Sequence, residues 1–465
     1  MLLTAIIIYL AITIAVGAWA SKFVKGSNDF VLAGRSLPLF LSASALFATW
    51  FGSETIFGAS SVYLEEGLQG VIEDPFGGAL CLVLFGMFYL RPMYRMGVLT
   101  IGDVFKKIYG KQIEFLSTIF MVPVFFGYVA AQLVALSLLF GIVTGMSLTE
   151  GILLSAGIVV IYTFLGGMWA ISITDFIQTI MIVLGLITVA ILVTKDAGGV
   201  SVILDSATEE SFQFFPDSGF DSWINYFGAW IIIGLGSIPS QDIYQRVMSA
   251  KSEKVAVQST YLAGGFYLTF GLLPLFIALG AKALYPELYL ENKQLMLPSM
   301  VLAHGGLPVQ IIFFGALISA IMSTASSGML APAALISENL IKPLFKGKLT
   351  DKHLLWILRI SVLGVAILAV WMALQDSNIY ELVAGASILM LVSLFVPLTS
   401  GLYWKKSSKI GAMLSMIIGM LTYLIMDNFE PEISSHIYGL LASALAMVAG
   451  SLLFPNKPQL SHELS

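Results

Sequence analysis

The sequence predicts an all-α polytopic membrane protein with about thirteen transmembrane helices, and three observations lead to this prediction. Hydrophobic residues make up 58% of the 465 residues, charged residues only 11%, and the mean hydropathy is +0.92. The apolar residues gather in runs of roughly 20, the length that a helix needs to cross the hydrocarbon core of a bilayer. Basic residues between these runs fall mainly on one side of the predicted membrane. A soluble domain with this composition is not expected.

The apolar runs give the predicted helices in order. Basic residues follow the first run and do not precede it, so it is interpreted as a membrane helix and not as a cleavable signal. The predicted spans cover residues 2–20, 37–62, 76–97, 114–143, 149–166, 169–194, 223–247, 255–281, 301–335, 354–375, 379–403, 409–427 and 434–454.

The basic residues predict the orientation. With the N-terminus outside, all but three of the 23 Lys and Arg residues fall on the cytoplasmic side, the exceptions being Lys195, Lys282 and Lys293. This distribution satisfies the positive-inside rule and would collapse if a central span had been missed. The odd number of spans then puts the C-terminus in the cytoplasm. The plasma (inner) membrane is the expected location.

Two groups of five spans organise the chain. A first helix and cytoplasmic loop (1–36) precede the first group (37–195), and an extracellular loop (196–222) leads to the second group (223–403). Two further helices and a short cytoplasmic tail (404–465) follow. Because an odd number of spans separates the starts of the two groups, they have opposite topology and can form an inverted repeat, an arrangement common in transporters.

Several classes of function have no support in the sequence. The single cysteine excludes an internal disulfide, and the four histidines lack the spacing of a zinc site. No nucleophile and base are arranged as in an enzyme, and nucleic-acid binding is not expected. The expected partners are the lipid bilayer and a small organic solute, whereas the oligomeric state is not determined.

The second span contains a stretch that weakens a helix at membrane depth. Residues 48–54 read Ala-Thr-Trp-Phe-Gly-Ser-Glu, which combines β-branched, aromatic and glycine residues with a carboxylate. Interrupted helices expose carbonyls that bind coupling ions. If the stretch is locally helical, Trp50 and Glu54 share a face and offer an organic cation a π-surface and a negative charge. The alternatives are that Trp50 packs in the core and that Glu54 faces a polar vestibule.

Polar residues also stand at the ends of the third, sixth and seventh spans. Glu73 and Asp74, at the outer start of the third span, are interpreted as solvated acids favoured by the helix dipole. Asp175 opens the sixth span near the cytoplasm, where a capping role competes with a role in ion exit. In the seventh span, a Gly-Ser-Ile-Pro-Ser-Gln stretch at 236–241 predicts a kinked helix with polar residues that can face a pathway. Arg246 is interpreted as an interfacial anchor.

The ninth span carries the strongest functional signal, a row of hydroxyls within an apolar run. Residues 320–327 read Ala-Ile-Met-Ser-Thr-Ala-Ser-Ser. Helical side chains lean towards the N-terminus, so the hydroxyls of Ser323 and Thr324 approach the carbonyl of Ala320. With carbonyls from the second span these oxygens make a plausible sodium cage. Close helix packing, with hydroxyls bonded back to their own helix, is the alternative.

Taken together and in this order, several motifs resemble the sodium:solute symporter family. They are Gly-Arg-Ser-Leu at 34–37, Ala-Thr-Trp at 48–50, Gly-Gly-Met at 166–168, Thr-Asp-Phe-Ile-Gln at 174–178, Tyr-Gln-Arg at 244–246 and Met-Ser-Thr at 322–324. The resemblance extends over about residues 1–430. It implies a LeuT-like five-plus-five inverted repeat, alternating access, and Na⁺ as the coupling ion.

The resemblance also implies roles for individual residues. Asp175 matches an aspartate associated with sodium movement towards the cytoplasm, an ion release path. The family's sodium site falls on the main-chain carbonyls of Ala48, Phe51 and Ala320 and on the hydroxyls of Ser323 and Thr324.

Within the family, the motifs look most like the high-affinity choline transporter branch. Trp50 falls where that branch has a Trp of its cation-binding cage, Tyr128 replaces another aromatic of the cage, and Ser240 stands where a further Trp is expected. A missing wall weakens cation–π binding of a quaternary ammonium, so Glu54 points to a different amine, either a smaller one or one that forms hydrogen bonds. The predicted substrate-binding residues are Trp50, Glu54, Tyr128, Ser240 and Gln241.

The predicted function is sodium-coupled secondary active symport of a small polar organic solute, with choline or a related amine among the candidates. A proton-coupled amino-acid or organic-solute transporter, using Glu54 or Asp175, is the alternative. A transporter-like receptor or a channel is more remote, and an enzyme is not expected.

Overall fold

A computed structural model describes residues 1–291, 293–345, 349–375 and 378–456, and in these ranges the chain forms helices joined by turns. Ten helical stretches of 19 to 39 residues are apolar enough to cross a membrane. Two shorter apolar helices, Leu39–Trp50 and Leu148–Ile161, and the broken pair α12 (Phe220–Gly236) and α13 (Gln241–Met248) complete thirteen segments in the described residues. The predicted all-α polytopic fold is confirmed.

The remaining helices follow the predicted order. In the first half they are α1 (Leu2–Ala20), α2 (Ser27–Leu32), α3 (Leu39–Trp50), α4 (Ala59–Gly70), α5 (Gly78–Leu84), α6 (Leu90–Met96), α7 (Ile101–Tyr109), α8 (Lys111–Met121), α9 (Val124–Thr144), α10 (Leu148–Asp196) and α11 (Val200–Asp205). In the second half they are α14 (Glu253–Leu284), α15 (Pro286–Glu291), α16 (Met296–His304), α17 (Leu307–Leu335), α18 (Asp351–Ala373), α19 (Ile379–Met390), α20 (Val396–Tyr403), α21 (Lys409–Asp427) and α22 (Ser435–Leu453).

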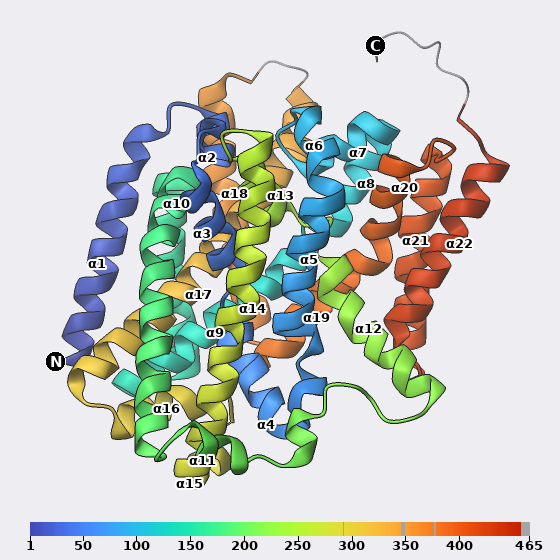
Figure 1. Cartoon of the computed structure of the whole chain (residues 1–465). Coiled ribbons are helices and arrows are strands. Elements are labelled where there is room, and N and C mark those ends of the chain that lie inside the picture. Colours follow the sequence, from blue (N-terminus) through green and yellow to red (C-terminus); the bar gives the residue numbers. More distant parts are fainter. Residues whose placement is uncertain (292, 346–348, 376–377, 457–465) are drawn as a thin grey trace.

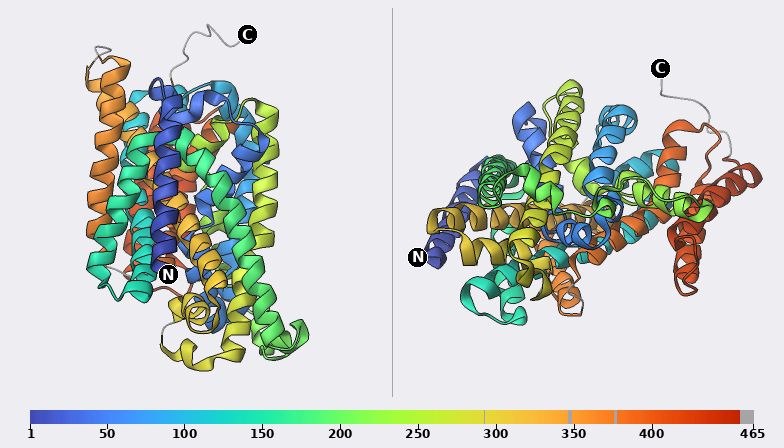
Figure 2. Two further views of the ribbon diagram at one scale, coloured as in Figure 1. Left: turned by 90° about the vertical axis from the view of Figure 1, so that its left-hand side faces the viewer. Right: turned by 60° about the horizontal axis from the view of Figure 1, so that its bottom comes forward.

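The two faces of the molecule carry different connections. Figure 1 shows α1 beginning on the face that also holds α4, α11, α15 and α16, whereas α22 ends on the opposite face. We call the first the N-terminal face. The extracellular loop 196–222, predicted to lie on the same side as the N-terminus, lies there. Figure 2 shows α21 and α22 at the end of the molecule that is distant from α1.

Among the interruptions of long helical segments in the described residues, three organise the central region. The fifth and sixth spans meet within α10 at Gly167, whose φ of 51° and ψ of −152° suit only glycine. α3 stops at Trp50, where Phe51 leaves the helical region with φ −74° and ψ 76°. α12 and α13 are separated by the turn 237–240, as the Gly and Pro residues predicted. The last two interruptions lie near the wholly buried stretch Phe313–Leu335 of α17.

One predicted boundary changes. Gly305 and Gly306 separate α16 from α17, so the ninth helix begins at Leu307 and not at residue 301, because two adjacent glycines favour a turn over a continuous helix. Of the predicted C-terminal tail, residues 457–465 lie outside the described residues.

Gly167→Ala tests the break within α10. An added Cβ would lie 2.6 Å from the Phe30 ring and 2.7 Å from the Phe30 carbonyl, on a backbone that other residues avoid. We expect a loss of about 1–3 kcal/mol in the free energy of unfolding, measured by thermal unfolding of the purified protein. Gly157→Ala, in the same helix with nothing within 4 Å, is the control and should not destabilise the protein. Equal stabilities of the two variants would contradict a strained break.

Candidate functional site

The break after Trp50 frees carbonyl groups from the α3 ladder. In a continuous helix the amides of Gly52 and Ser53 would bond the carbonyls of Ala48 and Thr49, four residues back. Instead, Gly52 N–H donates to the Trp50 carbonyl at 2.8 Å, and Ser53 N–H donates to Gln132 Oε1 at 3.0 Å. Buried carbonyls need other partners.

Side chains of three other helices supply these partners. Ser323 Oγ and Thr324 Oγ1 on α17 donate to the Ala48 carbonyl at 2.9 and 3.2 Å. Tyr128 OH on α9 donates to the Thr49 carbonyl at 2.8 Å. Tyr267 OH on α14 lies 3.3 Å from the Trp50 carbonyl. The interrupted segment is thus held by α17, α9 and α14 through consecutive residues.

Four of the five residues predicted to form an ion site come together here. Thr324 Oγ1 also lies 3.1 Å from the Ala320 carbonyl, so two hydroxyls and two carbonyls converge, all on fully buried residues. Phe51, the fifth, is the C-cap residue of α3. The next residue, Gly52, packs closely against Thr324, because a Cβ added to Gly52 would lie 2.6 Å from Thr324 Oγ1.

Asp175 joins this oxygen cluster directly. It is fully buried on α10, and its Oδ1 lies 2.5 Å from Ser323 Oγ, whose single proton is shared between this oxygen and the Ala48 carbonyl. The other oxygen, Oδ2, has no hydrogen-bond partner among the described residues. A carboxylate oxygen without a partner, next to hydroxyl and carbonyl oxygens, is the kind of donor set that a hard cation prefers. The residues present therefore fit a sodium ion.

Arg246 lies close to this cluster and not at the membrane interface. Its side chain is fully buried, donates to Ser327 Oγ on α17 and interacts electrostatically with Asp175. The prediction of an interfacial anchor was wrong because the break before α13 carries this helix into the core, where all of its residues are buried.

A cavity lies on the other side of the α3 break. It encloses about 270 Å³ including its open side, and its lining combines three aromatic rings, two carboxylic side chains, two hydroxyls and two aliphatic groups. The lining residues are Trp50, Glu54, Asp74, Tyr128, Ile233, Ser237, Tyr267, Val383 and Ser387.

Hydrogen bonds fix the polar side chains of this cavity. Glu54 Oε2 accepts from Gln132 Nε2 at 3.0 Å. Asp74 Oδ1 accepts from Tyr267 OH at 2.5 Å, whereas its Oδ2 has no partner among the described residues. Trp50 Nε1 donates to Asp242 Oδ2 at 2.9 Å, which orients the indole ring. One carboxylate oxygen therefore stays available for a bound molecule.

The predicted substrate residues divide into two groups. Trp50, Glu54 and Tyr128 line the cavity, whereas Ser240 and Gln241 are not among its lining residues. Ser240 donates to Asp242 and so touches the indole of Trp50 only through that carboxylate. Gln241 Oε1 accepts from the backbone N–H of Ile101 at 2.8 Å, at the start of α7 on the face opposite the N-terminal face.

Sequence reasoning missed Asp74 and Tyr267. Asp74 was expected to be solvated but is only 1% exposed, because the chain unwinds at this residue (φ −143°, ψ 123°) and its side chain meets Tyr267. The adjacent acids at the start of an apolar span were the only signal. Nothing in the sequence sets Tyr267 apart from the other tyrosines.

The fold and the site define a helical membrane transporter whose interrupted helices hold an ion-type oxygen cluster next to a solute cavity. The chain belongs to the sodium:solute symporter family, because the model of that family matches residues 30–419. It is therefore an integral multi-pass membrane protein and a sodium-coupled symporter of a small solute, with Na⁺ as the coupling ion. The family consists of transporters and not of enzymes.

Similar proteins agree with this assignment. The high-affinity choline transporter 1 of Drosophila melanogaster is 30% identical over 86% of this chain and 67% of its own length. The human high affinity choline transporter 1 is 28% identical over 92% and 77%. The high-affinity proline transporter PutP of Bacillus subtilis (strain 168) is 29% identical over 94% and 95%.

Solved structures confirm the LeuT-like fold. A Na⁺-coupled sialic acid symporter in a substrate-bound outward-open state superimposes with a TM-score of 0.85, at 18% identity and 98% coverage of both chains. A nucleobase-cation-symport-1 family transporter in a closed conformation gives a TM-score of 0.59 at 16% identity, covering 92% of this chain and 95% of its own.

Gln132→Met tests the clamp on the α3 break. Gln132 holds both Ser53 N–H and Glu54, so its loss leaves two buried polar groups without their partner. We expect a loss of roughly 2–4 kcal/mol in the free energy of unfolding, measured by thermal unfolding. Gln213→Met removes only an exposed bond to Asp217 and is the control. A loss no larger than that of the control would contradict the clamp.

Proposed function

We propose that the transported solute is a small protonated amine related to choline. The observation that carries this proposal is the pairing of Glu54 and Asp74 with the aromatic rings in one small cavity that no Lys, Arg or His lines. Both acids are more than nine-tenths buried. Burying two carboxylates has a high free-energy cost of desolvation unless a proton or a cation compensates their charge.

The ring and carboxylate chemistry favours an amine over a carboxylate solute. An ammonium group next to a desolvated Trp ring gains about 2 kcal/mol from cation–π attraction, in addition to its attraction to the acids. A solute carboxylate would face Glu54 and Asp74 and be repelled. The similarity to proline transporters therefore carries less weight than the similarity to choline transporters.

The free oxygen of Asp74 favours an amine that still carries N–H groups. A primary or secondary ammonium can donate to Asp74 Oδ2, whereas a quaternary ammonium has no donor. Ser240 provides no aromatic wall, so quaternary binding also loses a ring contact. The hydroxyls of Ser237 and Ser387, which lie 3.2 Å apart in the lining, suit a hydroxyl on the solute.

The proposed sodium site consists of the carbonyls of Ala48, Phe51 and Ala320 with the hydroxyls of Ser323 and Thr324. Asp175 contacts Ser323 and offers the ion a carboxylate as it leaves towards the cytoplasm. The ion would hold the α3 break against α17, and the same break carries Trp50 of the solute cavity. Linkage then requires sodium and solute to raise each other's affinity by the same factor.

We propose that the protein lies in the plasma membrane. Its N-terminal face would be outside the cell and its C-terminus in the cytoplasm. The distribution of Lys and Arg supports it, since the N-terminal face holds the three exceptions to the basic cytoplasmic side. Sodium and solute would then enter from the N-terminal face.

The double variant Ser323→Ala/Thr324→Ala tests the sodium site. It removes two of the five proposed ligands, so the sodium concentration for half-maximal thermal stabilisation should rise by at least about tenfold, corresponding to ~1.4 kcal/mol. Ser326→Ala is the matched control, because the Ser326 hydroxyl bonds its own helix at the Ser323 carbonyl. Stabilisation by lowered pH without sodium, retained in the double variant, would instead assign the carboxylates as proton carriers.

A panel of amines, amino acids, carboxylates and sugars, tested in sodium and in potassium, addresses the solute. We expect an amine to stabilise the purified protein only with sodium, and Asp74→Asn to weaken its binding by roughly 30-fold or more because a buried charge pair is lost. Asp221→Asn, in the exposed first turn of α12, is the control. A carboxylate solute that binds more tightly to Asp74→Asn would contradict the amine.

A further inference from the structure

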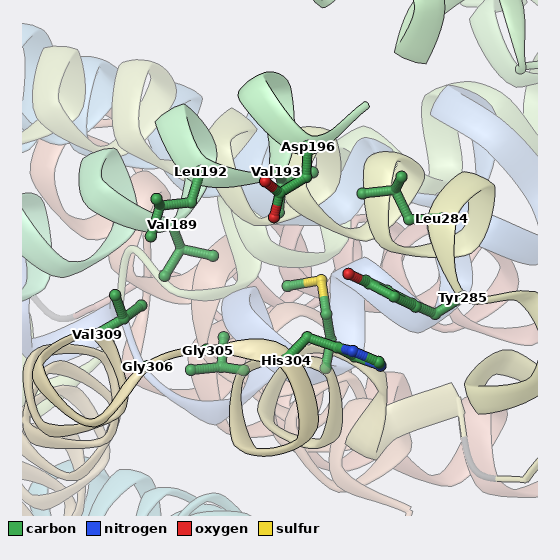
Figure 3. A pocket seen from close by; sticks show the side chains of 12 residues that line it. Val189, Leu192, Val193, Asp196, Leu284, Tyr285, His304, Gly305, Gly306 and Val309 are labelled. Carbon is green, nitrogen blue, oxygen red and sulfur yellow. The ribbon is translucent and has the colours of Figure 1, made fainter. Parts of the chain in front are cut away.

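A second cavity opens at the N-terminal face, away from the α3 break. It lies where the end of α10 meets the end of α14, α16 and the start of α17 (Figure 3), and it encloses about 480 Å³ including its mouth. Its floor is apolar, with Val189, Val193 and Val301 buried. None of its lining residues belongs to the ion cluster or to the solute cavity. The established symport gives it no role.

Three polar side chains complete this cavity. The rings of Tyr285 and His304 stack with centroids 3.7 Å apart and planes 9° apart, which makes one flat aromatic wall. Figure 3 shows the Tyr285 hydroxyl and the Asp196 carboxylate directed towards the same space. Asp196 is exposed, and no Lys or Arg stands among the lining residues. The cavity thus combines an apolar floor, an aromatic wall and one carboxylate at its mouth.

We infer that this cavity is a second binding site, for a small lipophilic amine with an apolar ring or short alkyl body. The apolar body fits the valine-lined floor, where each buried methylene contributes about 0.8 kcal/mol. The ammonium group lies near Asp196 and the aromatic wall, where charge attraction and cation–π attraction act together. An anion of the same shape gains only the apolar contacts and is repelled by the carboxylate.

The two cavities are distinct in depth and in chemistry. At 1.5 Å per residue, Val189 and Val309 lie about 20 Å along α10 and α17 from Asp175 and Ser323. The solute cavity beside the α3 break, which is the deeper one, is small and offers two buried acids, whereas this outer cavity is larger and offers a single exposed acid. A bulky lipophilic amine therefore fits the outer cavity and not the deep one.

Binding of benzyltrimethylammonium to the full-length protein in detergent tests this site. The probe is permanently charged and is measured in potassium, without sodium, by isothermal titration calorimetry. Asp196→Asn should weaken binding about threefold to fivefold, because exposed ion pairs contribute up to ~1 kcal/mol. Val309→Phe fills the cavity and should abolish binding. Benzenesulfonate, with the same ring and the opposite charge, should not bind.

Matched variants separate this site from the solute cavity. Asp205→Asn, at the end of α11, and Ile311→Phe, exposed on α17 and not in the lining, should bind the probe as the wild type does. No binding at millimolar probe, or equal binding by wild type, Asp196→Asn and Val309→Phe, would overturn the inference. Loss of binding only in Asp74→Asn would also overturn it by placing the probe in the deep cavity, and would leave the proposed function intact.

Discussion

The interruption of α3 against the middle of α17 is the constraint on which the rest of the site depends. Once the helix stops at Trp50, the carbonyls of Ala48 and Thr49 lose the amides that would have bonded them. Buried carbonyls cannot stay without partners in a membrane interior. Hydroxyls from α17 and α9 therefore converge on two consecutive residues, and Tyr267 of α14 approaches the third, Trp50. The helix break thus determines which helices meet at the centre.

The proposed sodium site and the proposed solute site share the interrupted turn of α3. Ala48 faces the oxygen cluster and Trp50 faces the cavity. A small displacement of the break therefore changes the geometry of both the cluster and the cavity. Coupling between two ligands needs a shared element whose position both affect. Here that element is a single turn of interrupted helix, which Gln132 holds in place by hydrogen bonds to Ser53 and Glu54.

Negative charge is the second common property of the site. Asp175 at the cluster and Glu54 and Asp74 at the cavity are all buried, and each keeps only part of its hydrogen-bonding capacity filled by protein groups. Carboxyl groups within a membrane protein are expensive and usually mark an ion or substrate path. At the cavity, whose lining residues include no Lys, Arg or His, this arrangement suits a cationic solute better than an anionic one, whereas at the cluster Arg246 interacts electrostatically with Asp175.

By itself, the sequence determined the number and order of the spans, the interruption near residue 50, the kink before α13 and the hydroxyls of Ser323 and Thr324. These features depend on apolar length, helix propensity and helical spacing, which act within one segment. Only the tertiary structure decided that Asp74 turns inward onto Tyr267, that Asp175 reaches Ser323, and that Gln241 faces α7 instead of the cavity. Each of these contacts joins residues that lie more than a hundred positions apart in the sequence, so its formation depends on how whole helices pack.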